Sequence, residues 1–258
     1  MRGWRSSVFF WGIPWLLFLG YPLLGLLWRG ASGSWQEWNS PVIWQAIRLS
    51  LVTTSIATLL VVLLGTPLAY ALARGRFVLH RAAELLVDLP MVLPPAVAGV
   101  ALLLAFGRQS LIGGWLEQLG ISPAFTPAAV VMAQMFVAGP IYVRAARAGF
   151  AAVDRSFEDV SLSLGHSPME TFFRITLPLA VPSLLEGVVM TWARALGEFG
   201  ATILFAGNFP GVTQTMPLAI YTAMQEDLQR AVWLSIYLLG VSLLLLAGVR
   251  FLGGKMYD

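Results

Sequence analysis

Long apolar stretches separated by short polar segments form the dominant pattern of the sequence. A transmembrane helix needs about 20 predominantly apolar residues to cross the hydrocarbon core of a bilayer. Six stretches reach this length, at residues 8–28, 47–73, 84–107, 125–147, 179–206 and 231–252. The pattern predicts an all-α integral membrane protein with six transmembrane helices. We expect one domain over residues 1–258, in which helix 1 (about 8–28) precedes a core of helices 2–6 (about 46–253).

The Lys and Arg residues predict which helix ends lie in the cytoplasm, because cytoplasmic loops of membrane proteins are enriched in both. One set of ends carries eleven of the 16 cations: Arg2, Arg5, Arg74, Arg76, Arg81, Arg144, Arg147, Arg155, Arg174, Arg250 and Lys255. The opposite set carries four: Arg29, Arg48, Arg108 and Arg230. This bias predicts that both termini are cytoplasmic, and an even number of helices agrees with it.

Composition supports the same class and excludes others. The chain is 58% hydrophobic and 11% charged, with a mean hydropathy of +0.77, whereas soluble domains are about a quarter charged. It has no Cys, and its two His residues are far apart, so no disulfide framework or zinc-ligand spacing is present. The only lysine lies in FLGGKMYD, which lacks the first glycine and the hydroxyl residue of a P-loop. We expect no cofactor or metal in this chain, no enzymatic activity of its own, and contact with membrane lipid but no nucleic acid.

The longest and most polar cytoplasmic segment joins the fourth and fifth predicted helices. Asp154 is suited to cap a helix whose first turn carries Glu158 and Asp159. Gly165 is suited to end that helix, and Pro168 to begin the next. We predict a short helix, a turn and a second helix. The pattern alone leaves two interpretations open, a docking surface for a partner or a loop packed on the lipid headgroups.

The fifth predicted helix contains charged residues within an apolar stretch. An isolated charge at the bilayer centre costs about 2.5–3.5 kcal/mol on insertion scales. Arg194 and Glu198 are four positions apart, so they share a helix face and are able to pair. Glu186 lies on the same face, closer to the cytoplasm. The stripe is expected to face protein or water, and its pair is either a structural brace or part of a translocation path or gate.

Small residues and prolines add local predictions. Small residues at every fourth position of the fifth helix would let a neighbouring helix approach closely: Ala193, Gly197 and Ala201. The third predicted helix contains three prolines, which we expect to bend it: Pro90, Pro94 and Pro95. The Gly- and Pro-rich segment 208–217 is expected on the external face, where it either meets a binding protein or folds back as a partial plug.

The cytoplasmic segment resembles the signature of binding-protein-dependent ABC importer permeases, which reads Glu-Ala-Ala, three residues, Gly, nine residues and Ile-x-Leu-Pro. Asp159-Val160-Ser161 stand at the first places, Gly165 at the glycine and Ile175-Thr176-Leu177-Pro178 at the end. The spacing matches in full, although Val and Ser replace the alanines. The stretches LPMVLPPAVAGVALLLAFG, RALGEFGATILFAGN and PGVTQTMPLAIYTAMQ are similar to molybdate and tungstate permeases of this family, and the likeness covers most of the chain from about residue 45.

This resemblance implies a coupling helix that sits in a groove of a separate ATPase subunit, which holds ATP and Mg²⁺. It places seven residues at or near that contact: Glu158, Asp159, Ser161, Leu162, Gly165, His166 and Met169. It also implies a homodimer of permeases, two ATPase subunits and a periplasmic or extracytoplasmic oxyanion-binding protein, in a prokaryotic plasma (inner) membrane. The fifth helices of the two copies are then expected to face one another across the path.

We therefore expect a permease subunit of an ATP-driven importer that moves molybdate, and also tungstate, into the cytoplasm. Sulfate permeases share the Gly-Glu-Phe-Gly core but diverge from MPLAIYTAMQ, so a sulfate or thiosulfate permease is the nearer alternative. An ion-coupled secondary transporter is the second, with Glu198 as its ion-binding residue; such proteins often contain an internal repeat, and none is visible in the sequence. No motif of an intramembrane enzyme is found.

Overall fold

The computed structural model describes residues 2–31, 41–75 and 78–254. Within these ranges every regular element is a helix, which confirms the all-α prediction. The helices are α1 (Arg2–Ala31), α2 (Pro41–Arg74), α3 (His80–Val92), α4 (Pro95–Phe106), α5 (Leu111–Gln118), α6 (Pro127–Ala152), α7 (Arg155–Ser163), α8 (Pro168–Thr171), the π-helix η2 (Phe172–Thr176), α9 (Leu177–Leu196), α10 (Gly200–Phe205), α11 (Met216–Glu226) and α12 (Leu228–Gly254). Arg76 and Lys255, which entered the orientation prediction, lie outside the described residues.

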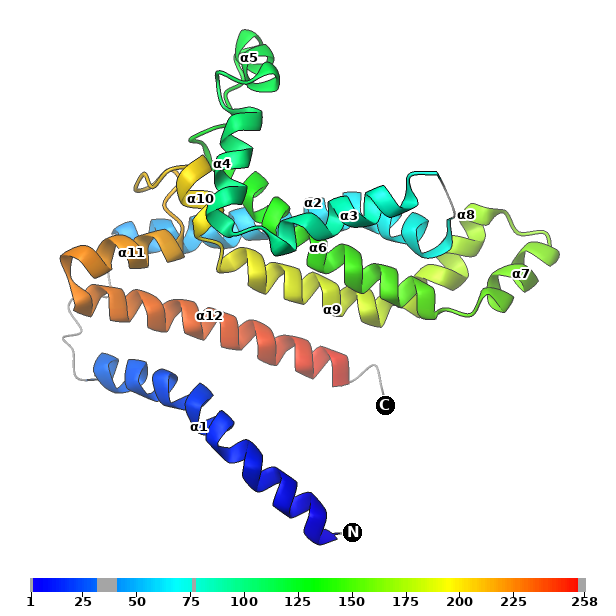
Figure 1. Cartoon of the computed structure of the whole chain (residues 1–258), viewed down its shortest axis with the longest axis horizontal. Coiled ribbons are helices and arrows are strands. Elements are labelled where there is room, and N and C mark those ends of the chain that lie inside the picture. Colours follow the sequence, from blue (N-terminus) through cyan, green and yellow to red (C-terminus); the bar gives the residue numbers. More distant parts are fainter. Residues whose placement is uncertain (1, 32–40, 76–77, 255–258) are drawn as a thin grey trace.

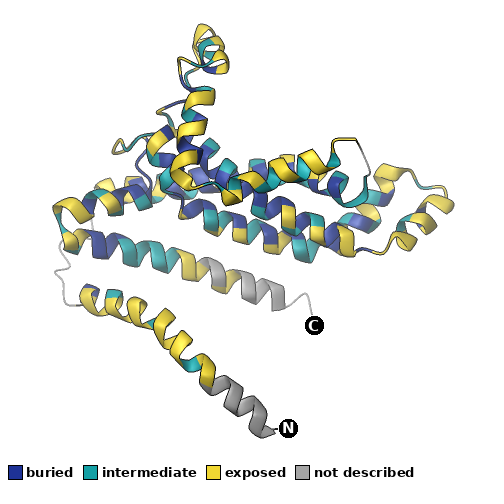
Figure 2. Cartoon of the chain, in the orientation of Figure 1, coloured by how far each residue is buried: buried dark blue, intermediate teal, exposed yellow. Residues whose placement is uncertain are grey.

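The helices α2, α6 and α9 lie side by side and form the centre of the molecule (Figure 1). Buried residues concentrate along them (Figure 2), and Tyr142 and Phe150 of α6 are fully buried there. Glycines allow this close packing. A Cβ atom added at Gly187 of α9 would lie only 2.9 Å from the Ala145 Cβ of α6.

Among the described residues, four helices are long and apolar enough to cross a membrane, at Trp11–Ala31, Pro41–Arg74, Pro127–Ala152 and Pro168–Leu196. A fifth crossing is possible if α3 and α4 together form one broken span, and Leu228–Leu244 is a shorter apolar helix. The lengths and composition of these helices indicate a multi-pass membrane protein. They match the first, second, fourth and fifth predicted stretches. The third is divided between α3 and α4, and the sixth (231–252) lies within α12 (Leu228–Gly254).

The third predicted span is not a straight helix over residues 84–107. It is divided into α3 and α4, whose axes are bent by 119°. The break lies at Leu93, which has an extended backbone (φ −68°, ψ 134°) immediately before Pro94. Proline disfavours the helical conformation of the residue before it. The predicted bend is confirmed, but α3, with 13 residues, is about 20 Å long, so it is shorter than the hydrocarbon core of about 30 Å.

The fifth predicted span also differs from the expected range of 179–206. Continuous helix begins at Pro168, runs through the π-helix η2 and ends at Leu196, after which α10 is a separate short helix. In η2 the Leu177 N–H donates to the carbonyl of Phe172, five residues earlier. This pattern is the wider turn that defines a π-helix.

The helix α1 stands apart from the central helices and packs along α12 (Figure 1). Its described side chains from Trp11 onward are mostly exposed, with Trp11 at 86% (Figure 2). The first turn of α1 and the last turn of α12 point toward the side of the molecule that carries α7 (Figure 1). The segment before α11 lies at the opposite end.

Candidate functional site: a helical hairpin and a charged helix break

The polypeptide between α6 and α9 folds into the α7–α8 hairpin (residues 154–171). Asp154 caps α7 by accepting a hydrogen bond of 2.9 Å from the Ser156 N–H. Gly165 turns the chain at a φ of 92°, in the left-handed region that glycine adopts without a steric penalty. Pro168 is the first residue of α8. The predicted helix, turn and second helix are therefore confirmed.

Hydrogen bonds from neighbouring serines favour the ionised form of two carboxylates in the hairpin. Glu170 accepts from the Ser167 N–H at 2.9 Å, while the Ser167 hydroxyl oxygen accepts from the Glu170 N–H at 3.3 Å. This reciprocal pair is a capping box. Hydrogen bonds from Ser167 lower the pKa of Glu170, and hydrogen bonds from Ser156 lower the pKa of Asp154, because they stabilise the charged form.

Ser161 lies inside the hairpin, where only 5% of the residue is exposed. Its hydroxyl oxygen is 2.9 Å from the hydroxyl oxygen of Thr171 on α8. Its carbonyl accepts from the His166 N–H at 3.2 Å. Ser161 therefore joins the two helices of the hairpin, and its side chain does not reach the outer surface.

Glu158 points from α7 toward the membrane helices. Its Oε1 atom is 2.9 Å from Nη2 of Arg74, the last residue of α2, and the two side chains are 14% and 12% exposed. The same oxygen accepts from the Thr176 hydroxyl at 2.7 Å. Arg74 also donates to the Val153 carbonyl at 2.8 Å. One carboxylate thus connects α7 with α2 and η2, and through Arg74 with the end of α6.

Several large apolar side chains are exposed on the hairpin, although its sequence is rich in polar residues. Asp159 and Gly165 are exposed and His166 is half-buried. Five large apolar side chains are between 44% and 74% exposed on it: Phe157, Val160, Leu162, Leu164 and Met169. Three of them, Phe157, Val160 and Leu164, were not among the predicted contact residues. Exposed apolar side chains of this kind are typical of a surface that meets a partner or the lipid headgroups.

The Arg194–Glu198 pair predicted from the sequence is present, with Nη1 of Arg194 2.8 Å from Oε2 of Glu198. Glu198 lies beyond the end of α9 and is 1% exposed, whereas the Arg194 side chain is 36% exposed. The second oxygen of Glu198 accepts from the Ala201 N–H at 2.9 Å, in the first turn of α10. Glu198 therefore holds the start of α10, where a negative charge is favourable.

The three small residues do not form one continuous ridge, because the helix is interrupted at Gly197. Ala193 and Gly197 are exposed at the end of α9, while Ala201 is fully buried in α10. Close approach does occur, but between α10 and α4. A Cβ atom added at Gly99 would lie 2.9 Å from the Ala201 carbonyl oxygen. The helical ridge predicted over three turns is wrong in its geometry for this reason.

Glu186 is exposed on α9, on the part of the helix nearer the α7–α8 hairpin.

A buried side-chain amide lies near the break between α9 and α10. Gln134 of α6 is 1% exposed and donates to the Thr54 hydroxyl at 3.1 Å and to the Ala195 carbonyl at 3.2 Å. Sequence reasoning did not single out Gln134, although an amide within an apolar span is unusual enough to identify it. It ties α2 and α6 to the end of α9.

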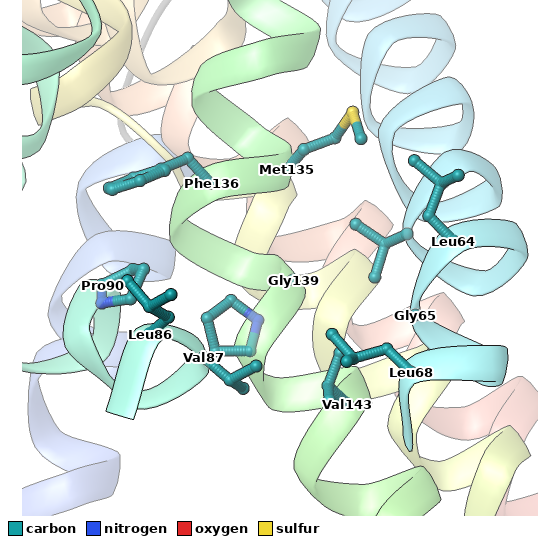
Figure 3. Close-up of a pocket in the computed structure, with 12 residues that line it drawn as sticks. Leu64, Gly65, Leu68, Leu86, Val87, Pro90, Met135, Phe136, Gly139 and Val143 are labelled. Carbon is teal, nitrogen blue, oxygen red and sulfur yellow. The ribbon is translucent and has the colours of Figure 1, made fainter. Parts of the chain in front are cut away.

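A groove of 290 Å³ lies between α2, α3 and α6 (Figure 3). Leu64 and Leu68 line it from α2, Leu86 from α3, and Met135 and Phe136 from α6 (Figure 3). All twelve lining residues are apolar. A dianion would lose its hydration there without gaining a polar partner, so the groove is not suited to bind an oxyanion.

Similar proteins include several named permeases. The chain is 44% identical over 235 residues to the molybdenum transport system permease protein ModB of Mycobacterium tuberculosis, covering 91% of this chain and 89% of that protein. It is 42% identical over 183 residues to ModB of Escherichia coli, covering 70% and 80%. A probable sulfate transport system permease protein, cysT of Chlorokybus atmophyticus, is 33% identical and covers 93% and 88%.

The fold is that of a bacterial ABC transporter involved in alginate import, whose crystal structure matches with a TM-score of 0.77, 15% identity and coverage of 100% of both chains. An inward-facing methionine transporter, MetNI, matches with a TM-score of 0.59, 18% identity and coverage of 91% and 96%. The family described as "Binding-protein-dependent transport system inner membrane component" matches residues 62–256. The chain therefore belongs to this family of transport permeases.

Proposed function

We propose that this chain is the permease subunit of an ATP-driven importer that moves molybdate, and also tungstate, into the cytoplasm. The observation that carries the proposal is the likeness to molybdenum permeases, at 44% identity over 91% of the chain. The α7–α8 hairpin supports it, since a separate ATPase needs a folded, exposed surface on which to act. A sulfate permease is the second candidate, on the weaker likeness of 33% identity.

The proposed assembly contains two copies of this chain, two ATPase subunits that bind ATP and Mg²⁺, and an external oxyanion-binding protein. The whole chain forms one transmembrane domain with six crossings in the inner membrane, and α3 together with α4 makes the third. The hairpin faces the cytoplasm, as do both termini. The Lys and Arg bias of the loops supports this orientation, and so do the common directions of the ends of α1 and α12 (Figure 1).

In the proposed mechanism, ATP binding draws the two ATPases together and moves the hairpins, and the membrane helices change from inward-facing to outward-facing. Asp159, Leu162, Gly165 and Met169 contact the ATPase, with His166 at the edge of the contact. Arg194 faces the translocation path, supported by its 36% exposure, while Glu198 braces the helix break. Glu186 lines the same path on the hairpin side. The near-balance of charge fits a path that passes the anion without holding it.

Uptake into proteoliposomes tests this function. The chain is reconstituted with the ATPase and binding protein encoded beside it, and radiolabelled molybdate is offered with tungstate or sulfate as competitor. We expect uptake that requires ATP, the ATPase and the binding protein, and that tungstate inhibits. Competition by sulfate would support the second candidate instead. Transport by this chain alone, driven by an ion gradient, would contradict the importer assignment.

Substitution of Gly165 by Arg tests the hairpin contact. A Cβ atom at Gly165 meets nothing within 4 Å, so the new side chain would project outward without a clash inside the chain. We expect uptake and ATPase co-purification to fall at least tenfold. Gly120→Arg is the matched control, because Gly120 also has a positive φ (75°) and open space but lies near α5. Equal losses in both variants would indicate backbone strain rather than a lost contact.

A further inference from the structure

The helix α2 is bonded at both ends to segments that lie at opposite sides of the molecule (Figure 1). At one end Arg74 pairs with Glu158 of the α7–α8 hairpin at 2.9 Å. Toward the other end the Ser50 hydroxyl oxygen accepts a hydrogen bond of 2.7 Å from the N–H of Met216, the first residue of α11. Ser50 is fully buried, so this bond is shielded from competing water.

The helix between these two contacts is continuous, although it contains Pro67, and it is closely packed along one face. It runs for 34 residues from Pro41 to Arg74, and the 25 residues from Ser50 to Arg74 span about 36 Å. One face of α2 is buried between Ser50 and Leu72 and packs against α6 and α9, while the opposite face is exposed. Since packed interiors deform little, a displacement at the Arg74 end reaches the Ser50 end with little loss.

The Arg74–Glu158 contact is suited to transmit force because its atoms have few alternative partners. Both side chains are nearly buried, and Glu158 Oε1 is held at the same time by the Thr176 hydroxyl. Nη2 of Arg74, the nitrogen nearest Glu158, also donates to the Val153 carbonyl. An exposed ion pair would yield by exchanging partners with water, whereas separating this one would leave a charge in a poorly hydrated site.

We propose that the Arg74–Glu158 pair is the joint through which movement of the α7–α8 hairpin enters the membrane domain, and that α2 carries it to residues 208–216 on the opposite side. This inference rests on the proposed function, in which an ATPase moves the hairpin. Arg74, Glu158 and Ser50 are positioning residues, because they act on the path through α2. Glu158 then acts inside the chain, and not in the ATPase contact that the family resemblance implied for it.

Hydrogen exchange in the complete complex tests the joint without needing the transported anion. The permease and its ATPase subunits are placed in lipid nanodiscs, and exchange at the amides of residues 208–216 is compared with and without a non-hydrolysable ATP analogue and Mg²⁺. The variants are Arg74→Gln, Glu158→Gln and Ser50→Ala, with Arg74→Lys as the conservative substitution. Asp88→Asn and Arg144→Gln are controls, since this pair (3.6 Å) joins α3 to α6 and is about half exposed.

We expect the analogue to change exchange at residues 208–216 at least fivefold in the wild type, the controls and, in part, Arg74→Lys. In Arg74→Gln, Glu158→Gln and Ser50→Ala we expect less than a twofold change, although the ATPases still co-purify and hydrolyse ATP. An unchanged response in Arg74→Gln and Glu158→Gln would overturn the proposal. Loss of the ATPases from those variants, or an equal loss of response in the controls, would also overturn it, because the pair would then be only structural.

The same preparations separate this inference from the proposed function. If the wild-type complex responds to the ATP analogue but transports no molybdate, the substrate assignment fails and the joint stands. If no ATPase binds the wild-type chain, the proposed function fails, and the joint fails with it.

Discussion

Glu198 shows how a charge is accommodated within an apolar segment of this chain. Both of its oxygens have a partner, one the Arg194 guanidinium and the other the Ala201 N–H. The carboxylate lies where the helix is interrupted, and unpaired backbone N–H groups at the start of a helix attract negative charge. The hydrogen bond to α10 therefore holds Glu198 in position as much as its ion pair does. The two contacts can be tested separately.

Substitution of Glu198 distinguishes the two roles considered for the Arg194–Glu198 pair, a structural brace or a gate. Glu198→Gln keeps an oxygen for the Ala201 N–H but loses the ion pair, whereas Glu198→Ala loses both. We expect Glu198→Ala to lower the free energy of unfolding by about 1.5–3 kcal/mol, and Glu198→Gln to lower it less. Thermal unfolding of the purified protein in detergent measures both. A gate would instead show as a folded, assembled Glu198→Gln variant whose uptake is reduced more than its stability.

At the scale of elements, the α7–α8 hairpin has a predictable dependence on pH. The pKa values of Asp154 and Glu170 are lowered by hydrogen bonds that exist only in the folded hairpin. A carboxylate with a lowered folded pKa stabilises the fold above its ordinary pKa, of about 4, and this contribution is lost as the pH falls through the lowered value. The hairpin is therefore expected to keep this contribution to its stability at neutral pH and to lose the contribution in acid.

The Glu170→Gln substitution checks the direction in which the stability of the hairpin changes with pH. At pH 7 we expect faster hydrogen exchange at residues 167–171 in the variant than in the wild type, after correction for the intrinsic rate. As the pH falls from about 4 through the lowered pKa of Glu170, the wild-type carboxylate becomes protonated and the difference between the two proteins should shrink and then disappear. A difference that stays constant from pH 7 to pH 3 would show that the charge of Glu170 does not contribute to the cap.

The residue types at the caps and turns predicted the helices of the hairpin well. Contacts between residues far apart in the sequence could not be predicted in this way. Asp154, Gly165 and Pro168 act through their immediate neighbours, so their roles follow from the residue types alone. Arg74 was counted only as one cytoplasmic cation, because its pairing with Glu158, 84 positions away, depends on the packing of α2 beside α6. The break at Leu93 followed from Pro94, but the 119° bend and the packing of α4 on α10 require the tertiary fold.

At the scale of the whole molecule, the surface implies a larger assembly. The Ala193 and Gly197 positions at the end of α9 are exposed in the single chain, although they lie within a stretch that the sequence predicts to cross the membrane. The described part of α1 is also mostly exposed. Small exposed residues in a membrane segment allow another helix to pack closely, which is consistent with two copies that meet along α9.

Cross-linking tests whether the two copies meet along α9. The chain has no cysteine, so only the introduced thiol reacts with the cross-linker. We expect Ala193→Cys to give a covalent dimer with a flexible bis-maleimide reagent in native membranes. Leu85→Cys on α3 is the control, since that residue is 72% exposed but distant in sequence from the proposed contact. Dimers from Leu85→Cys but not from Ala193→Cys would place the two-fold axis elsewhere.

The π-helix η2 fixes the rotational setting of the hairpin. Each residue of an α-helix advances the chain by about 100° around the axis. The wide turn at Phe172–Thr176 absorbs one residue without interrupting the helix. Deleting a residue there would therefore restore a regular helix and rotate the apolar face of the hairpin by roughly 100° about α9. The nine residues between Gly165 and Ile175 thus determine the direction in which the hairpin faces, as well as its distance from the membrane helices.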